Sequence, residues 1–185
     1  MTCLLALENT QLTDEVTMTA TGVSGVTDGG ASISSQVDEV FTVEQCLYAI
    51  MVASANDIAL QIAEHVGGSV DGFVQQMNTR AQELGCTNTV FTNPTGLPDD
   101  NQHTTAHDMA LIMQAAIQNE SFRTIAAATS YTIPDTNKAA ARNLTSKFTM
   151  TDTGSTGFYE GCIGGKEGYT EAPEVHWYVQ PSEMA

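Results

Sequence analysis

The sequence predicts an α+β domain with a mainly helical core. Apolar residues recur with the spacing of a helix in several segments between residues 42 and 127. By contrast, residues 9–41 are rich in Thr, Ser, Val and Gly and contain few helix formers, which favours short strands and turns. The 185 residues are 42% hydrophobic, a fraction that is typical of one globular domain with its own core.

Helices in the first half of the chain are indicated by their start and stop signals. Residues 1–8 have the pattern of an amphipathic helix. Residues 42–45, T-V-E-Q, form a capping box, in which the Thr and Gln side chains satisfy free amides, and predict a helix through about Met51. Apolar residues between 58 and 66, followed by two glycines, predict a second helix. A third is expected over residues 69–84.

The second half contains fewer helical signals. Thr105 begins a capping motif that predicts a helix through Ile117, and a shorter helix is expected over residues 122–127. After Pro134 the chain is polar up to Ile163. At that point we expect an edge strand that carries Lys166.

Charge and composition exclude several classes of protein. The chain has 22 acidic and 6 basic residues, for a net charge of −16. An anionic surface repels phosphate backbones, so nucleic acid is not an expected partner. No apolar run approaches the ~20 residues that span a bilayer, and residues 1–8 lack the features of a signal peptide, so membrane association is not encoded. The four cysteines lie far apart, without a C-x-x-C pair, and are expected to be buried.

Two tripeptides suggest a specific chemistry. They are S-A-N at residues 54–56 and K-E-G at residues 166–168. Serine acyl-transferases of the penicillin-binding type use three signatures, S-x-x-K, S-x-N and K-T-G, and the two tripeptides resemble the second and third. The first signature, which holds the nucleophilic serine, does not occur, because none of the three lysines has a serine three positions before it.

The sequence around these tripeptides resembles one family closely. From residue 4 to residue 170 the chain is similar to D-alanyl-D-alanine carboxypeptidases, the low-molecular-mass penicillin-binding proteins. The matching stretches are residues 4–8, 42–49, 54–57, 88–97, 103–110 and 159–166. So many matching stretches in one order make the resemblance specific, whereas S-x-N alone would carry no weight.

The resemblance implies a fold and a domain organisation. We expect the helical part of a penicillin-binding-protein/β-lactamase-like transpeptidase fold, with an incomplete antiparallel sheet. Residues 1–170 would form a partial carboxypeptidase-like domain, and residues 171–185 a divergent C-terminal tail. Residues 1–8 resemble the end of the apolar helix that follows S-x-x-K in the family, so the nucleophilic serine and its lysine are expected just before Met1. The chain is therefore interpreted as a fragment that is inactive as given.

The resemblance also implies a role for each remaining site residue in acyl transfer. Ser54 resembles the hydroxyl that relays a proton toward the leaving amine. Asn56 resembles the amide that hydrogen-bonds the substrate backbone, and Lys166 the positive charge that faces the substrate's terminal carboxylate. Gly168 resembles the glycine that lets the strand approach the peptide without a side chain in the way.

The implied partners are a peptidoglycan stem peptide that ends in D-Ala-D-Ala and, in the intact family, β-lactams. The implied location is the cell envelope, outside the cytoplasm. The resemblance implies no cofactor and no metal ion.

Glu167, at a substrate-binding position, departs from the family pattern, which has a threonine or serine there. A carboxylate about 4 Å from the substrate carboxylate would repel it by roughly 1 kcal/mol in water, and by more in a drier cleft. It could also pair with Lys166. Glu167 keeps open a second hypothesis, a non-catalytic pseudo-enzyme that binds wall peptides or a protein partner. A β-lactamase is a third and less favoured one.

Several candidates also have a plainer interpretation. Ser54 could simply cap the helix that follows it, and Lys166 could be an ordinary surface lysine. His103 and His107 have the spacing of a metal-binding pair on a helix. Thr105 is predicted to begin the helix between them, however, which favours ordinary polar residues.

Overall fold

The structure, a computed structural model, describes residues 1–26 and 30–168. The predicted C-terminal tail, residues 171–185, lies outside the described residues. In chain order the elements are α1 (Thr2–Asn9), β1 (Glu15–Thr17), α2 (Ala20–Ser24), β2 (Val40–Thr42), α3 (Val43–Ala53), α4 (Asn56–Gly67), α5 (Val70–Glu83), α6 (Ala106–Ala116), α7 (Glu120–Ala126), β3 (Ser130–Ile133) and β4 (Arg142–Thr145). The predicted α+β class with a mainly helical core is confirmed.

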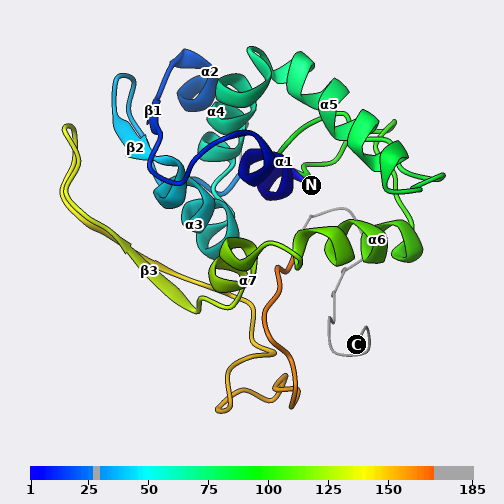
Figure 1. Cartoon of the computed structure of the whole chain (residues 1–185). Coiled ribbons are helices and arrows are strands. Elements are labelled where there is room, and N and C mark those ends of the chain that lie inside the picture. The colour runs from blue at the N-terminus through cyan, green and yellow to red at the C-terminus, as the bar shows by residue number, and fades with distance from the viewer. Residues whose placement is uncertain (27–29, 169–185) are drawn as a thin grey trace.

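Helix α1 lies in the middle of the helical body (Figure 1). It packs against α3, α4, α5 and α7. Five consecutive side chains, residues 2–6, are buried. The prediction of an amphipathic helix was therefore wrong in one respect, because this short helix is surrounded by others and has no continuous polar face at its start.

Local capping signals place most helix ends where the sequence predicts them. The Thr42 hydroxyl accepts a hydrogen bond from the Gln45 amide, and the Gln45 side chain accepts one from the Thr42 amide, so the capping box at the start of α3 is confirmed. Helix α4 ends at Gly67, and its C-cap, Gly68, has the left-handed φ of 72° that favours glycine. The Ser69 hydroxyl caps α5, and the Thr105 hydroxyl caps α6.

Two elements were not predicted. One is α2, a five-residue helix inside the segment expected to be strands and turns, whose start is capped by the Thr19 hydroxyl. The other is the antiparallel hairpin of β3 and β4, which buries Ile133 and Leu144 among mostly polar neighbours. Both elements are short, and two buried apolar residues in a polar stretch give little periodicity to detect.

The strands of the described ranges form two separate two-stranded antiparallel sheets, β1 with β2 and β3 with β4. The edge strand predicted around Lys166 is absent from residues 162–168. A strand needs a neighbour to pair with, and here the segment makes one backbone hydrogen bond to α7 instead, from the Gly165 amide to the Ala126 carbonyl at 3.1 Å.

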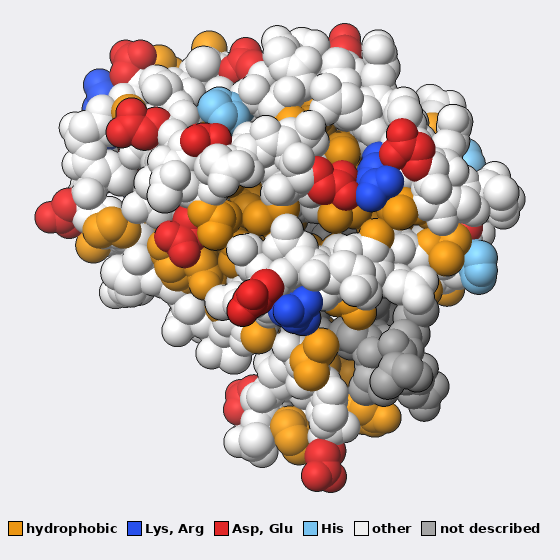
Figure 2. Space-filling view, viewed as in Figure 1, with side chains coloured by type: hydrophobic (Ala, Val, Ile, Leu, Met, Phe, Trp, Pro, Cys, Tyr) orange, Lys and Arg blue, Asp and Glu red, His pale blue; other side chains and the backbone are white. Residues whose placement is uncertain are grey.

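Three of the four cysteines, Cys3, Cys46 and Cys86, are buried as predicted, and Cys162 is half-buried. Acidic side chains are spread over the face in Figure 2, with few basic ones among them. Among the described residues no helix combines the length and the apolar character needed to cross a membrane.

Candidate functional site

Ser54 occupies the junction between α3 and α4. It is the C-cap of α3, in the left-handed conformation with φ 57° and ψ 34°, and its side chain is exposed. The N-cap of α4 is Ala55, and no side chain caps that helix. The interpretation of Ser54 as a helix N-cap is therefore wrong. The left-handed conformation is common for a residue that ends a helix, although serine adopts it less readily than glycine.

Asn56 is the first residue of α4 and is 6% exposed. Its backbone amide donates a 2.8 Å hydrogen bond to the carbonyl of Ala31. The turn formed by residues 54–56 is thus held on one side by α3 and on the other by the segment around Ala31. Tertiary contacts, and not local propensity alone, fix its shape.

Lys166 is held in place by two glycines that precede it. A Cβ on Gly164 would lie 2.6 Å from the Ala126 carbonyl oxygen, and Gly164 has a φ of 151°. A Cβ on Gly165 would lie 2.5 Å from the ring of Phe148. Only glycine lets the backbone approach α7 and Phe148 so closely. These contacts therefore fix the position of the backbone from which the Lys166 side chain extends.

The surroundings of Lys166 are not those of a solvated surface lysine. Its side chain is partly buried, and its ammonium group donates a 2.6 Å hydrogen bond to the backbone carbonyl of Glu167. Burial lowers the pKa of Lys166, the nearby charge of Glu167 offsets this in part, and Lys147 lowers it further. The plainer interpretation of Lys166 is therefore wrong.

Glu167 does not form the ion pair with Lys166 that the sequence left open, since none of the four salt bridges in the described part of the chain joins them. Only the backbone carbonyl of Glu167 contacts the ammonium group. Gly168 is exposed, and a Cβ built on it would meet none of the described residues within 4 Å.

Helix α1 interacts with elements of both motifs. The charge of Lys166 acts on the thiol of Cys3, although burial dominates and raises the pKa of Cys3 to about 11. Helix α1 also packs against α3 and α4, which meet at Ser54. The S-A-N turn thus joins two helices that both pack against α1, and Lys166 interacts electrostatically with Cys3 in the first turn of the same helix.

Two residues near the motifs had no assigned role in the sequence. Asp57 directly follows the S-A-N turn, and its carboxylate is 1% exposed. Cys3 lies in the first turn of α1, and its thiol interacts electrostatically with Lys166. The position of Asp57 beside the motif is the one sequence signal that could have identified it, whereas only the tertiary structure shows the position of Cys3.

The two histidines do not share a helix face. His103 pairs with Val90 in an isolated β-bridge before α6, and His107 lies in the first turn of α6 with its side chain 78% exposed. The prediction that His103 lies outside the helix is confirmed. Within residues 1–26 and 30–168 no cluster of three or more His, Cys, Asp or Glu residues could hold a metal ion.

Comparison with known proteins identifies the relatives of this chain. The sequence profile of the family described as D-alanyl-D-alanine carboxypeptidase matches residues 1–175. The chain is 34% identical to D-alanyl-D-alanine carboxypeptidase DacF of Bacillus subtilis over 177 residues, which are 92% of this chain and 43% of DacF. It is also 34% identical to DacB2 of Mycobacterium tuberculosis, over 86% of this chain and 54% of DacB2. The chain therefore spans about half the length of these two relatives.

Solved structures show the same fold. The D-alanyl-D-alanine carboxypeptidase of Mycobacterium tuberculosis matches with a TM-score of 0.79 and 30% identity, over 92% of this chain and 62% of the solved chain. The Streptomyces K15 DD-transpeptidase matches with a TM-score of 0.82 and 26% identity, over 92% and 68%. The predicted penicillin-binding-protein type of fold is confirmed.

Proposed function

Because this chain belongs to the D-alanyl-D-alanine carboxypeptidase family, we propose that it carries part of a serine-type D-Ala-D-Ala carboxypeptidase site of peptidoglycan metabolism. The proposed ligand is a stem peptide that ends in D-Ala-D-Ala, which places the protein in the cell envelope, outside the cytoplasm. The activity and partners of the longer relatives enter only as part of this proposal.

The exposed hydroxyl of Ser54 carries the proposal. The backbone amide of Ser54 makes the C-cap bond of α3, and the hydroxyl caps neither α3 nor α4, so it is available for a proton relay at a fixed helix junction. Asn56 follows in the same turn, and its side-chain amide would hydrogen-bond the peptide. Lys166 supports the assignment. Its ammonium group is partly buried, and a cation that has lost part of its water is favourably paired with the carboxylate of a bound peptide. Glu167 and Gly168 would line the carboxylate end of the peptide.

No serine of residues 1–185 is assigned as the nucleophile. No S-x-x-K occurs in the sequence, so the present residues would supply binding and proton relay but no activated serine. We expect that a fluorescent penicillin leaves the mass of the intact chain unchanged. A stable adduct on any serine would overturn this part of the proposal.

Binding can be tested on the chain as it stands, by titrating it with a tripeptide that ends in D-Ala-D-Ala and following the NMR spectrum. We expect binding that is weaker by tenfold or more in Lys166→Ala, because the cation that faces the carboxylate is removed. Lys138→Ala, which removes an exposed lysine at the tip of the β3–β4 hairpin, is the matched control and should bind like the unchanged chain. Equal binding of a peptide that ends in L-Ala-L-Ala would contradict the proposed specificity.

A second candidate function is non-catalytic binding of wall peptides, which Glu167 favours because it replaces a hydroxyl donor with a like charge. A chimaera that adds the S-x-x-K segment and the remaining strands of a related enzyme separates the two. Hydrolysis of a D-Ala-D-Ala peptide by this chimaera would support the enzyme. Binding without hydrolysis would support the pseudo-enzyme.

A further inference from the structure

Asp57 carries a buried carboxylate immediately after the S-A-N turn. It is 1% exposed, and its Oδ2 accepts hydrogen bonds from the Ser32 hydroxyl at 2.7 Å and from the Ser35 hydroxyl and amide at 2.8 and 3.2 Å. Its Oδ1 accepts a longer bond from the Ile33 amide, at 3.4 Å. A buried carboxylate needs such partners, and one short segment of chain supplies all of these.

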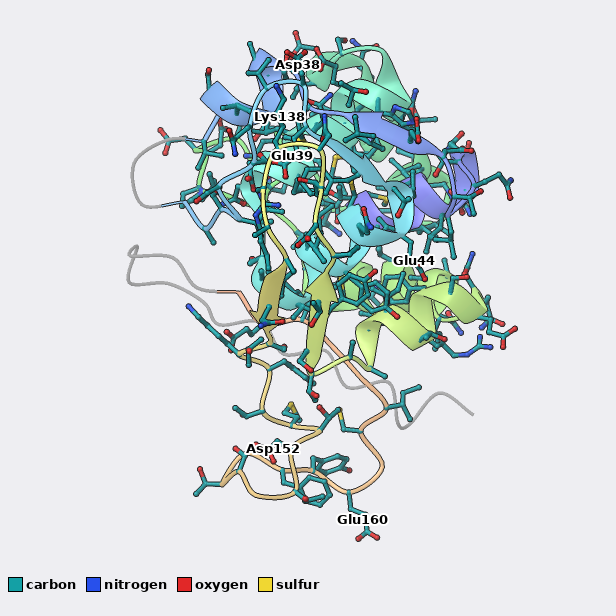
Figure 3. The ribbon with its side chains drawn as sticks, turned by 90° about the vertical axis from the view of Figure 1, so that its left-hand side faces the viewer. Asp38, Glu39, Glu44, Lys138, Asp152 and Glu160 are labelled. Atoms are coloured by element: carbon teal, nitrogen blue, oxygen red, sulfur yellow. The ribbon has the colours of Figure 1, made fainter. Side chains whose placement is uncertain are left out.

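That segment, residues 31–39, is here called the anchored segment, because a second buried carboxylate holds its other end. Glu39 is fully buried and accepts two bonds from the Arg142 guanidinium, at 2.8 and 3.0 Å. Thr136 and the Gln36 amide also donate to it. Asp38, Glu39 and Lys138 lie close together in Figure 3, where the anchored segment meets the hairpin tip.

The anchored segment is connected directly to the S-A-N turn. The Ala31 carbonyl accepts the 2.8 Å hydrogen bond from the Asn56 amide. Ser54, in that turn, and Ser34, in the anchored segment, both have the left-handed φ that non-glycine residues rarely adopt, at 57° and 58°. Such conformations persist only where the surrounding contacts determine them.

We infer that Asp57 is a positioning residue for the S-A-N turn. Its carboxylate fixes the anchored segment, and the anchored segment holds the amide of Asn56 through Ala31. The orientation of Ser54 and Asn56 toward a ligand thus depends on a charge that itself touches no ligand. The consequence for peptide binding rests on the proposed function, whereas the consequence for the geometry of the turn does not.

Asp108 provides a matched control within the same chain. It is also 1% exposed and also lies in the first turn of a helix, α6. Its Oδ2 accepts bonds from the Asn88 amide at 2.8 Å and the Thr89 hydroxyl at 2.7 Å. It therefore fixes residues 88 and 89 and has no bond to the anchored segment. Any general cost of replacing a buried, hydrogen-bonded aspartate should appear in both variants.

The test compares Asp57→Asn and Asp108→Asn in the full chain by amide hydrogen exchange and by the NMR chemical shifts of Ser54. We expect at least tenfold faster exchange of the Ser35 and Asn56 amides in Asp57→Asn, with a shift of the Ser54 Cα signal away from its left-handed value. Asp108→Asn should leave these signals unchanged and speed exchange at Asn88. Unchanged Asn56 and Ser54 signals in Asp57→Asn, or equal changes in both variants, would overturn the inference.

A milder variant covers the case in which Asp57→Asn does not fold. Ser35→Ala removes one donor and leaves the carboxylate in place, so we expect faster exchange of the Asn56 amide by a few-fold. An Asn56 amide that exchanges as in the unchanged chain would count against the inference.

Peptide binding separates this inference from the proposed function. If the unchanged chain binds the peptide that ends in D-Ala-D-Ala, Asp57→Asn should weaken binding at least fivefold and Asp108→Asn less than twofold. Equal weakening would contradict a positioning role. If the unchanged chain does not bind, the proposed function fails, and the exchange and chemical-shift data still decide the role of Asp57.

Discussion

The two motifs of the candidate site are held by different kinds of structure. The turn of residues 54–56 joins two helices of the helical body and is braced by the anchored segment. Lys166 follows a long irregular segment, residues 146–165, which projects from the body and carries Asp152 and Glu160 far from it (Figures 1 and 3). The serine side of the site thus depends on helix ends and buried charges, and the lysine side on two glycine contacts.

Because the two motifs are held differently, substitutions near the serine motif should affect the whole domain, and substitutions near the lysine motif should act locally. A change that removes a buried charge in the helical body should lower the stability of the whole domain. A change at the glycines should displace Lys166 while the body stays folded, because little else connects that segment to α7.

The largest effect is expected from Arg142→Leu. This change leaves the fully buried Glu39 carboxylate without its bidentate partner, and breaking a buried ion pair in this way costs about 3–5 kcal/mol of unfolding free energy. Urea unfolding followed by circular dichroism measures the loss. The double variant Glu39→Gln, Arg142→Leu should lose less, and a double variant that loses as much as the single one would contradict an unpaired charge as the cause.

A smaller and more local effect is expected from Gly165→Ala. The new methyl group would lie 2.5 Å from the Phe148 ring, and such overpacking costs about 1–3 kcal/mol. We expect the NMR signals of Lys166 to change while those of α3 and α4 remain. Gly168→Ala is the matched control, because a Cβ there meets no atom of residues 1–26 or 30–168 within 4 Å. Widespread changes in α3 and α4 would show that the two regions are more tightly coupled than described.

The pH dependence of stability tests the anchor at Glu39. Burial alone would raise the pKa of Glu39, but hydrogen bonds from Arg142 and Thr136 outweigh it and hold the pKa below its ordinary value. A depressed carboxyl pKa contributes stability that is present above the unfolded value of about 4.3 and is lost as the pH falls through the folded value. We expect Tm to fall as the pH drops below about 4.3, and to fall less steeply in Glu39→Gln. Parallel Tm curves for the two proteins would contradict this assignment.

The smallest effect is expected from Glu167→Thr. Removing a charge that repels the peptide carboxylate should strengthen binding of the D-Ala-D-Ala peptide by roughly fivefold, since about 1 kcal/mol of repulsion is relieved in water. Glu160→Thr, on the projecting segment, is the control and should leave the affinity unchanged. If both variants bind alike, residue 167 points away from the peptide and the pseudo-enzyme hypothesis loses its main support.

The sequence by itself determined most of the helices and the family. Thr42, Ser69 and Thr105 mark helix starts, and Gly68 marks an end, because capping bonds form between residues only a few positions apart. The S-A-N and K-E-G tripeptides likewise consist of consecutive residues and can be found in the sequence alone. The stretches around them were sufficient to indicate the family.

Only the tertiary structure decided which side chains brace the site. The sequence suggested a cap for Ser54, a surface position or an edge strand for Lys166, and no partner for Asp57. The structure instead places a left-handed C-cap, a partly buried cation and an anchored carboxylate at these positions. The positions of Lys166 and of the Asp57 carboxylate depend on contacts between residues that are distant in the chain, such as Gly165 with Phe148 or Asp57 with Ser35, and no local pattern encodes such contacts.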